Sequence, residues 1–125
     1  MEGMETVLLV EDESIVLDVS REWLEAMGYR VLTARDGKEA IEIYKNNRDK
    51  IDLVILDMVM PRMGGGEAYD KMKEISPNVK VLLSSGYSVE GQAKEILARG
   101  CDALIQKPFR MRELVQKMRG VLDKR

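Results

Sequence analysis

The chain has 125 residues, 45% hydrophobic and 34% charged, and this length fits one domain, residues 1–125, that buries a sizeable core without disulfide bonds. Cys101 is its single cysteine and it has no histidine, which excludes an internal disulfide, Ser-His-Asp or Cys-His catalysis, and most zinc sites. Since 20 basic and 22 acidic side chains are interspersed and no apolar run could span a bilayer, we expect a cytoplasmic protein with no direct nucleic-acid or membrane binding.

Short apolar runs alternate along the chain with longer segments of helical period, which is typical of an α/β domain with a mainly parallel sheet. Near-continuous hydrophobicity, clearest in Ile51–Leu56, indicates strands covered on both faces. The second run carries Arg30 and is interpreted as an edge strand. We expect residues 1–5 to be disordered or added to the natural sequence. The five predicted strands are Thr6–Val10, Tyr29–Ala34, Ile51–Leu56, Val79–Leu83 and Ala103–Ile105.

Helical periodicity fills the segments between these strands. In the first helix Ile15, Val19, Trp23 and Met27 recur every four residues, so we expect this stripe, including Trp23, to pack in the core. Residues 64–66 are interpreted as a flexible glycine turn before the third helix. Five strand and helix units with right-handed crossovers predict a flavodoxin-like, doubly wound parallel sheet of strand order 2-1-3-4-5 with five helices. The other helices are marked by Ala40, Ile43 and Tyr44, by Ala68, Met72 and Ile75, by Ala93, Ile96 and Leu97, and by Leu114, Val115, Met118 and Leu122.

Polar side chains follow the predicted strands at their carboxyl ends, where ligands bind in sheets of this kind. Glu11 and Asp12 follow the first strand and Asp57 follows the third. Three neighbouring carboxylates need a compensating cation, and all-oxygen ligation suits Mg²⁺. Asp57 could then act as a nucleophile towards a phosphoryl group, while Lys107 and Ser85 stabilise the phosphoryl oxygens. Each of these residues also has a purely structural interpretation, as a helix-terminal acid, a capping hydroxyl or a surface lysine.

Four segments carry a resemblance to a known family: VLLVEDE at 7–13, LDMVMPRMGG at 56–65, LLSSGYS at 82–88 and GCDALIQKPF at 100–109. The chain is similar over nearly its whole length to the receiver domain of two-component response regulators, which has the CheY-like version of this fold. SSGYS also resembles receivers attached to hybrid sensor kinases. The resemblance implies a signalling domain that is not an enzyme in the ordinary sense.

The resemblance also implies site residues and partners. Asp57 would be the phosphorylated residue, and Lys107 and Ser85 would meet the phosphoryl group. The Mg²⁺ ligands would be Glu11, Asp12, Asp57 and the backbone carbonyl of Val59, and the Lys107–Pro108 peptide bond would be cis. The donor would be a sensor histidine kinase or a histidine phosphotransfer protein, and an output protein or domain would act downstream. The switching surface would comprise the fourth helix, fifth strand and fifth helix, through which a weak homodimer could form.

One position departs from the family pattern. Leu104 occupies the place where the family commonly has Tyr or Phe as a rotamer switch. Any switch should therefore depend on Ser85 moving towards the phosphoryl group and displacing residues 86–90. The alternatives are a pseudo-receiver that only binds a partner, or a small phosphatase of the same fold. A flavodoxin is disfavoured because EDES at 11–14 is acidic where a phosphate loop would be needed.

Overall fold

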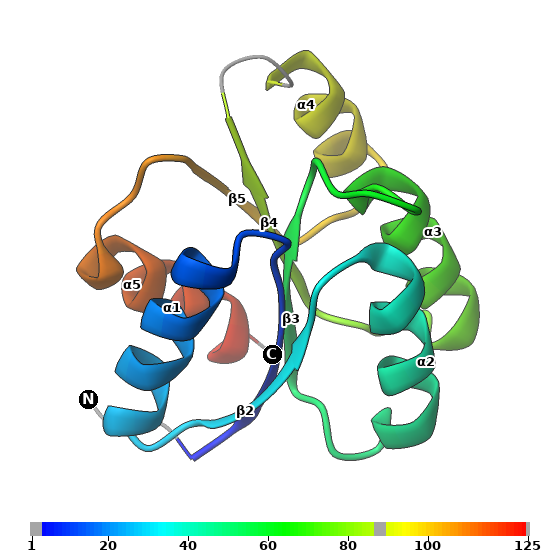
Figure 1. The fold of residues 1–125 in the computed structure, drawn as a ribbon. Helices are drawn as coiled ribbons and strands as arrows, with labels where there is room; N and C mark the ends of the chain where they lie inside the picture. The colour runs from blue at the N-terminus through cyan, green and yellow to red at the C-terminus, as the bar shows by residue number, and fades with distance from the viewer. Residues whose placement is uncertain (1–3, 87–89, 125) are drawn as a thin grey trace.

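The computed structural model describes residues 4–86 and 90–124, which form ten helices and strands. In chain order these are β1 (Thr6–Val10), α1 (Ser14–Ala26), β2 (Arg30–Ala34), α2 (Gly37–Asn47), β3 (Leu53–Asp57), α3 (Gly65–Ile75), β4 (Val81–Ser85), α4 (Glu90–Ala98), β5 (Ala103–Gln106) and α5 (Met111–Leu122). The strands pair in parallel in the order β2-β1-β3-β4-β5. Helices α1 and α5 cover one face of the sheet, and α2, α3 and α4 cover the other (Figure 1). The predicted doubly wound fold is confirmed.

The central strands are buried along their whole length because helices cover both faces of the sheet. All five residues of β3 and of β4 are buried, as near-continuous apolar runs predict. β2 lies at one edge, and its Arg30 is exposed, as expected. β3 ends one residue later than predicted and β4 two residues later, so Asp57 and Ser84 are paired inside the sheet. This places their polar side chains at the carboxyl edge with the rigidity of strand residues.

Two apolar cores lie on the two faces of the sheet. Alternation of side chains along each strand sends Leu8, Val54 and Leu83 to one core and Val7, Ile55 and Leu82 to the other. Helices α2, α3 and α4 supply Ala40, Tyr44, Ala68, Tyr69, Met72, Ala93 and Ile96 to the first core, and α1 and α5 supply Leu17, Leu24, Leu114, Val115, Met118 and Val121 to the second. Cys101 is buried in the first core, as expected.

The predicted core stripe of α1 is wrong for three of its four residues, and only Met27, which follows the helix, packs against the core. The side chains of Ile15, Val19 and Trp23 are 80%, 51% and 44% exposed. The helix instead buries Leu17, Ser20 and Leu24. Since an α-helix turns by about 100° per residue, Leu24 lies on a different face from its neighbour Trp23. Hydrophobic periodicity does not identify this face, because the polar residue Ser20 lies in the middle of the buried row. Trp23 is therefore a partly exposed residue on the outside of α1.

Two further expectations need revision at the ends of elements. Gly65 and Gly66 are the first residues of α3, and Gly64 is its N-cap, so this segment is not a free glycine turn. Of the segment 1–5 expected to be disordered, residues 1–3 lie outside the described residues, whereas Glu5 is held by specific contacts. Its backbone carbonyl accepts a hydrogen bond from Arg30, and its carboxylate pairs with Arg119 at 2.8 Å. Within the described residues, no helix is both long and apolar enough to cross a membrane.

Candidate functional site

Three carboxylates meet at the carboxyl edge of β1 and β3. Glu11 and Asp12 directly follow β1, and Asp57 is the last residue of β3. One oxygen from each carboxylate lies within 4.8 Å of the other two. Backbone hydrogen bonds hold both segments, from the Glu11 N–H to the Ala34 carbonyl at 3.0 Å and from the Met58 N–H to the Ser84 carbonyl at 2.9 Å. The sheet thus brings residues 46 positions apart in sequence into one acidic cluster.

Lys107 reaches the same cluster from the end of β5, which lies beyond β4 in the sheet. Its Nζ lies 2.8 Å from Glu11 Oε1 and 3.3 Å from Asp57 Oδ2. The Lys107 N–H donates to the Ser85 carbonyl at 2.7 Å, which continues the pairing of β5 with β4. The Lys107–Pro108 peptide bond is cis, as expected from the family resemblance. One ammonium therefore contacts two of the three carboxylates.

Burial makes the charge on Asp57 costly. Asp57 and Glu11 are each 5% exposed, whereas Asp12 is exposed to solvent. Burial and the nearby charge of Glu11 raise the pKa of Asp57 to about 7, although Lys107 acts in the opposite direction. Burial would lower the pKa of Lys107, but its hydrogen bond to Glu11 and the charges of Asp57 and Glu11 outweigh burial and raise it. The cluster thus carries more negative charge than its lysine neutralises.

The chemistry of these donors fits a hard divalent cation. All three side chains present oxygen, and two of them are buried carboxylates whose repulsion a cation would relieve. Mg²⁺ in proteins keeps several waters and binds one or two carboxylates together with phosphate oxygens. The exposed Asp12 marks the open side of the cluster. The residues present are therefore suited to hold Mg²⁺.

The other predicted site residues lie at the same edge or beside it. Ser85 is 1% exposed and ends β4, one position beyond the Ser84 that pairs with Asp57. Val59 lies two residues after Asp57, in the loop between β3 and α3, and its side chain is 59% exposed. Leu104 is partly buried against the core beneath α2, α3 and α4. Tyr87, Ser88 and Val89, which belong to the predicted switch segment, lie outside the described residues.

A contact that the sequence did not suggest joins the loop after β3 to the start of α2. Arg62 pairs with Asp36 through its Nε at 2.8 Å and through a second guanidinium nitrogen. Asp36 is 4% exposed, and it caps α2 by accepting the Glu39 N–H at 2.8 Å. An Asp-Gly pair before a helical segment signals the cap, but nothing in the sequence links position 36 to position 62.

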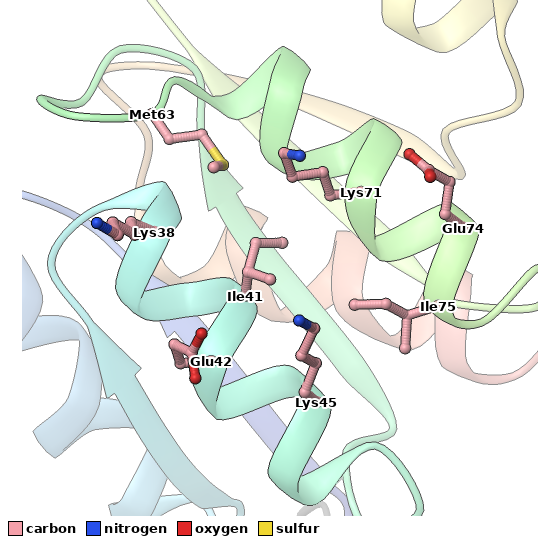
Figure 2. A pocket seen from close by; sticks show the side chains of 8 residues that line it. All are labelled: Lys38, Ile41, Glu42, Lys45, Met63, Lys71, Glu74 and Ile75. Atoms are coloured by element: carbon pink, nitrogen blue, oxygen red, sulfur yellow. The ribbon is translucent and has the colours of Figure 1, made fainter.

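Two of the grooves on the described surface lie beside α2 and beside α1. A groove of about 370 Å³ runs between α2 and α3, where Lys38, Lys45 and Lys71 surround apolar side chains that include Ile41 and Ile75 (Figure 2). A larger, mainly apolar groove of about 630 Å³ lies between α1 and the segment from Lys107 to Met111. Its lining includes the exposed residues Ile15 and Val19. The exposed stripe of α1 is thus continuous with a surface that reaches Lys107.

Comparisons with known proteins point to one family. Residues 7–119 match the model of the response regulator receiver domain. Sensor kinase CckA of Brucella abortus is 33% identical over 99% of this chain but 13% of its own length, and response regulator SaeR of Staphylococcus aureus is 31% identical over 97% of this chain and 52% of its own. The chain thus spans about half, or much less, of these curated relatives.

Solved structures agree with the family match. A response regulator receiver domain protein from Clostridium thermocellum has a TM-score of 0.91 and 28% identity, covering 95% of this chain and 94% of that chain. The complex of CheX with CheY, BeF₃ and Mg²⁺ from Borrelia burgdorferi contains a chain with a TM-score of 0.89 and 30% identity, covering 96% of this chain and 90% of that chain.

Proposed function

Since this chain belongs to the response regulator receiver domain family, a family of signalling domains rather than classical enzymes, we propose that it accepts a phosphoryl group on Asp57 from a partner's phosphohistidine. The observation that carries the proposal is the contact of Lys107 with both Glu11 and Asp57, beside a cluster of three carboxylates. A partly buried lysine and three acids at the carboxyl edge of a parallel sheet are the groups that phosphoryl transfer to a carboxylate requires.

The chain's own residues have distinct parts in the transfer. A carboxylate oxygen of Asp57 attacks the phosphorus, the P–N bond to the donor imidazole breaks, and the imidazole keeps the electron pair and takes up a proton. Lys107 neutralises charge on the phosphoryl oxygens, and Ser85 donates a hydrogen bond to one of them. The product is an aspartyl phosphate, which water later hydrolyses.

Receiver domains generally bind Mg²⁺, and the acidic cluster here is suited to hold it. We assign Glu11, Asp12, Asp57 and the backbone carbonyl of Val59 as its ligands. A bound Mg²⁺ ion neutralises negative charge shared between the carboxylates and the phosphoryl group. The pKa of about 7 for Asp57 in the metal-free protein supports this assignment, because a carboxylate at that position needs a cation to remain ionised at neutral pH.

The partners follow from the chemistry. Histidine is absent from the chain, so a phosphohistidine must belong to another protein or to another part of a longer protein. We propose a sensor histidine kinase or a histidine phosphotransfer protein as the donor. The surface of α4, β5 and α5 would change on phosphorylation and contact an output protein, a further domain or a second copy. Leu104 replaces the usual aromatic switch, so the change would start from Ser85.

The test is incubation with phosphoramidate, a donor with a P–N bond, in the presence of Mg²⁺. Intact mass spectrometry should show the addition of one phosphoryl group per chain, and borohydride reduction with peptide mapping should locate it at Asp57. Asp57→Asn should abolish uptake. Asp49→Asn, at an exposed aspartate outside the cluster, is the matched control and should leave uptake unchanged. One phosphoryl group per chain on Asp57→Asn would refute the assignment.

The same assay separates the alternatives. A small phosphatase would release many equivalents of phosphate per chain from a phosphomonoester such as p-nitrophenyl phosphate, whereas a receiver is modified once. A pseudo-receiver would take up no phosphoryl group at all from phosphoramidate. We favour the receiver over both alternatives because Glu11, Asp12, Asp57 and Lys107 are all present and lie together.

A further inference from the structure

We propose that the ion pair between Arg62 and Asp36 holds the loop after β3 in the position where the Val59 carbonyl can bind a metal ion. This inference rests on the proposed function, because Val59 is a ligand only if the acidic cluster binds Mg²⁺. Arg62 and Asp36 would be positioning residues, since neither belongs to the three carboxylates of the cluster.

The loop is fixed firmly at its two ends. The Met58 N–H donates to Ser84, and the Gly65 N–H donates back to the Met58 carbonyl, both at 2.9 Å. Gly65 lies so close to β3 that a Cβ there would be 2.4 Å from the Asp57 carbonyl oxygen. Among the described residues, Val59 itself makes no hydrogen bond. Its two neighbours, Met58 and Met60, are buried in the core. The position of its carbonyl therefore depends on these neighbours and on the segment that follows.

The Arg62–Asp36 pair is a charged contact of that segment with the start of α2, beside the buried side chain of Met60. Arg62 has φ of +66°, a conformation that a residue other than glycine keeps only where its surroundings impose it. The Asp36 carboxylate is 6% exposed and accepts both the Arg62 guanidinium and the Glu39 N–H. The Arg62 side chain is 64% exposed, so only the Asp36 end of the pair is removed from water. Hydrogen bonds between ionised groups are stronger than neutral ones.

A second contact next to the ion pair brings the loop against α2. The Gly37 N–H donates to the Met63 carbonyl at 3.1 Å, and a Cβ at Gly37 would lie 2.3 Å from that oxygen. Figure 2 shows Met63 at the end of α2 that carries Lys38. Loss of the Arg62–Asp36 pair would leave this backbone contact in place, so we expect a displaced loop rather than an unfolded one.

Two substitutions remove the ion pair and preserve the local backbone. Asp36→Asn keeps an oxygen that can cap α2, because Asn and Asp are equivalent N-caps. Arg62→Asn keeps a residue that tolerates the left-handed conformation. We expect each variant to raise the Kd for Mg²⁺ by about threefold to tenfold, at the lower end of losses seen when partners of metal ligands are removed. The double variant should be no worse than the weaker-binding single variant, because both changes break one contact.

Isothermal titration calorimetry with Mg²⁺ measures these constants, and circular dichroism in EDTA checks folding. Asp70→Asn is the control, since it breaks the Asp70–Arg99 pair between α3 and α4 and should leave the Kd unchanged. If Arg62→Asn fails to fold, Arg62→Gly relieves the left-handed conformation and should show the same weakened binding.

Single variants that bind Mg²⁺ as tightly as the wild type would overturn the inference even if they were less stable. Additive losses in the double variant would also overturn it. In both cases the wild type would still bind Mg²⁺, and the proposed function would stand. A wild-type protein that binds no Mg²⁺ would refute the metal site itself, and this inference with it.

Discussion

Lys107 donates a hydrogen bond to Glu11 across 96 positions of sequence, with 2.8 Å between Nζ and Oε1. The same ammonium lies 3.3 Å from Asp57 Oδ2. The lysine is thus the counter-ion of two buried carboxylates. The charge balance of the cluster therefore depends on the same residue that we propose for phosphoryl transfer.

Replacing Lys107 by methionine should disturb both carboxylates. Lys107→Met removes the positive charge that opposes the rise in the pKa of Asp57, so that pKa should move above about 7. The protein should also lose roughly 1 to 3 kcal/mol of stability at pH 8, because two buried carboxylates lose their partner. ¹³C NMR of the carboxyl groups measures the pKa, and urea unfolding measures the stability. Lys45→Met, on the exposed side of α2, should change neither, and an unchanged Asp57 pKa in Lys107→Met would contradict the prediction.

Asp57 should make the metal-free protein less stable as pH rises. Its pKa is about 7 in the folded protein and close to 3.9 in an unfolded chain, so between these values the folded state binds more protons. Stability from this group is complete below about pH 4 and is lost as pH rises through 7. Asp57→Asn removes the ionisation, so in EDTA the variant should exceed the wild type by about 2 to 4 kcal/mol at pH 8 and by little at pH 4.

Urea unfolding of wild type and Asp57→Asn at the two pH values gives this difference. Asp36 and Glu5 have lowered pKa values and make stability rise with pH. Their contribution is the same in both proteins, so it cancels in the stability difference. Added Mg²⁺ should stabilise the wild type at pH 8 and leave the variant nearly unchanged. A stability difference that is equal at pH 4 and pH 8 would show that Asp57 ionises normally.

Gly65 should not tolerate a side chain. A Cβ at this position would lie 2.4 Å from the Asp57 carbonyl oxygen and 2.9 Å from Met58 Cα. Gly65→Ala should cost roughly 1 to 3 kcal/mol through this overlap and weaken Mg²⁺ binding by moving the chain next to Asp57. Gly120→Ala is the matched control in α5, where no atom lies within 4 Å of the added Cβ, and it should stabilise the protein by about 0.5 to 1 kcal/mol. Equal stabilities of the two variants in thermal unfolding would be inconsistent with the close approach.

Sequence patterns predicted the sheet order and the residues of the acidic cluster because both depend on local signals. An apolar run followed by Asp57, or by Glu11 and Asp12, is visible along the chain, and the topology of parallel strands brings such ends together. The Arg62–Asp36 pair depends on two loops meeting in space, and neither loop has a periodic pattern. The positive φ of Arg62 was also not predictable, because arginine is not a residue type that favours this conformation.

The buried face of α1 was missed for a different physical reason. Apolar periodicity locates a core face only where the core row is more apolar than its neighbours. In α1 the row that faces the sheet includes Ser20, which is 5% exposed, while the row beside it carries Ile15, Val19 and Trp23. The pattern therefore selected the wrong side of a helix whose existence and position it predicted correctly.

Paired substitutions in α1 test which side faces the core. Leu24 is completely buried and Ile15 is 80% exposed, although both are large aliphatic residues of the same helix. Leu24→Ala should destabilise the protein by about 2 to 5 kcal/mol through lost contacts and a residual cavity. Ile15→Ala should change stability by no more than about 0.5 kcal/mol, because its side chain loses little contact and alanine favours the helix. Urea unfolding of both variants under one condition makes the comparison, and a larger loss from Ile15→Ala would restore the apolar stripe as the core face.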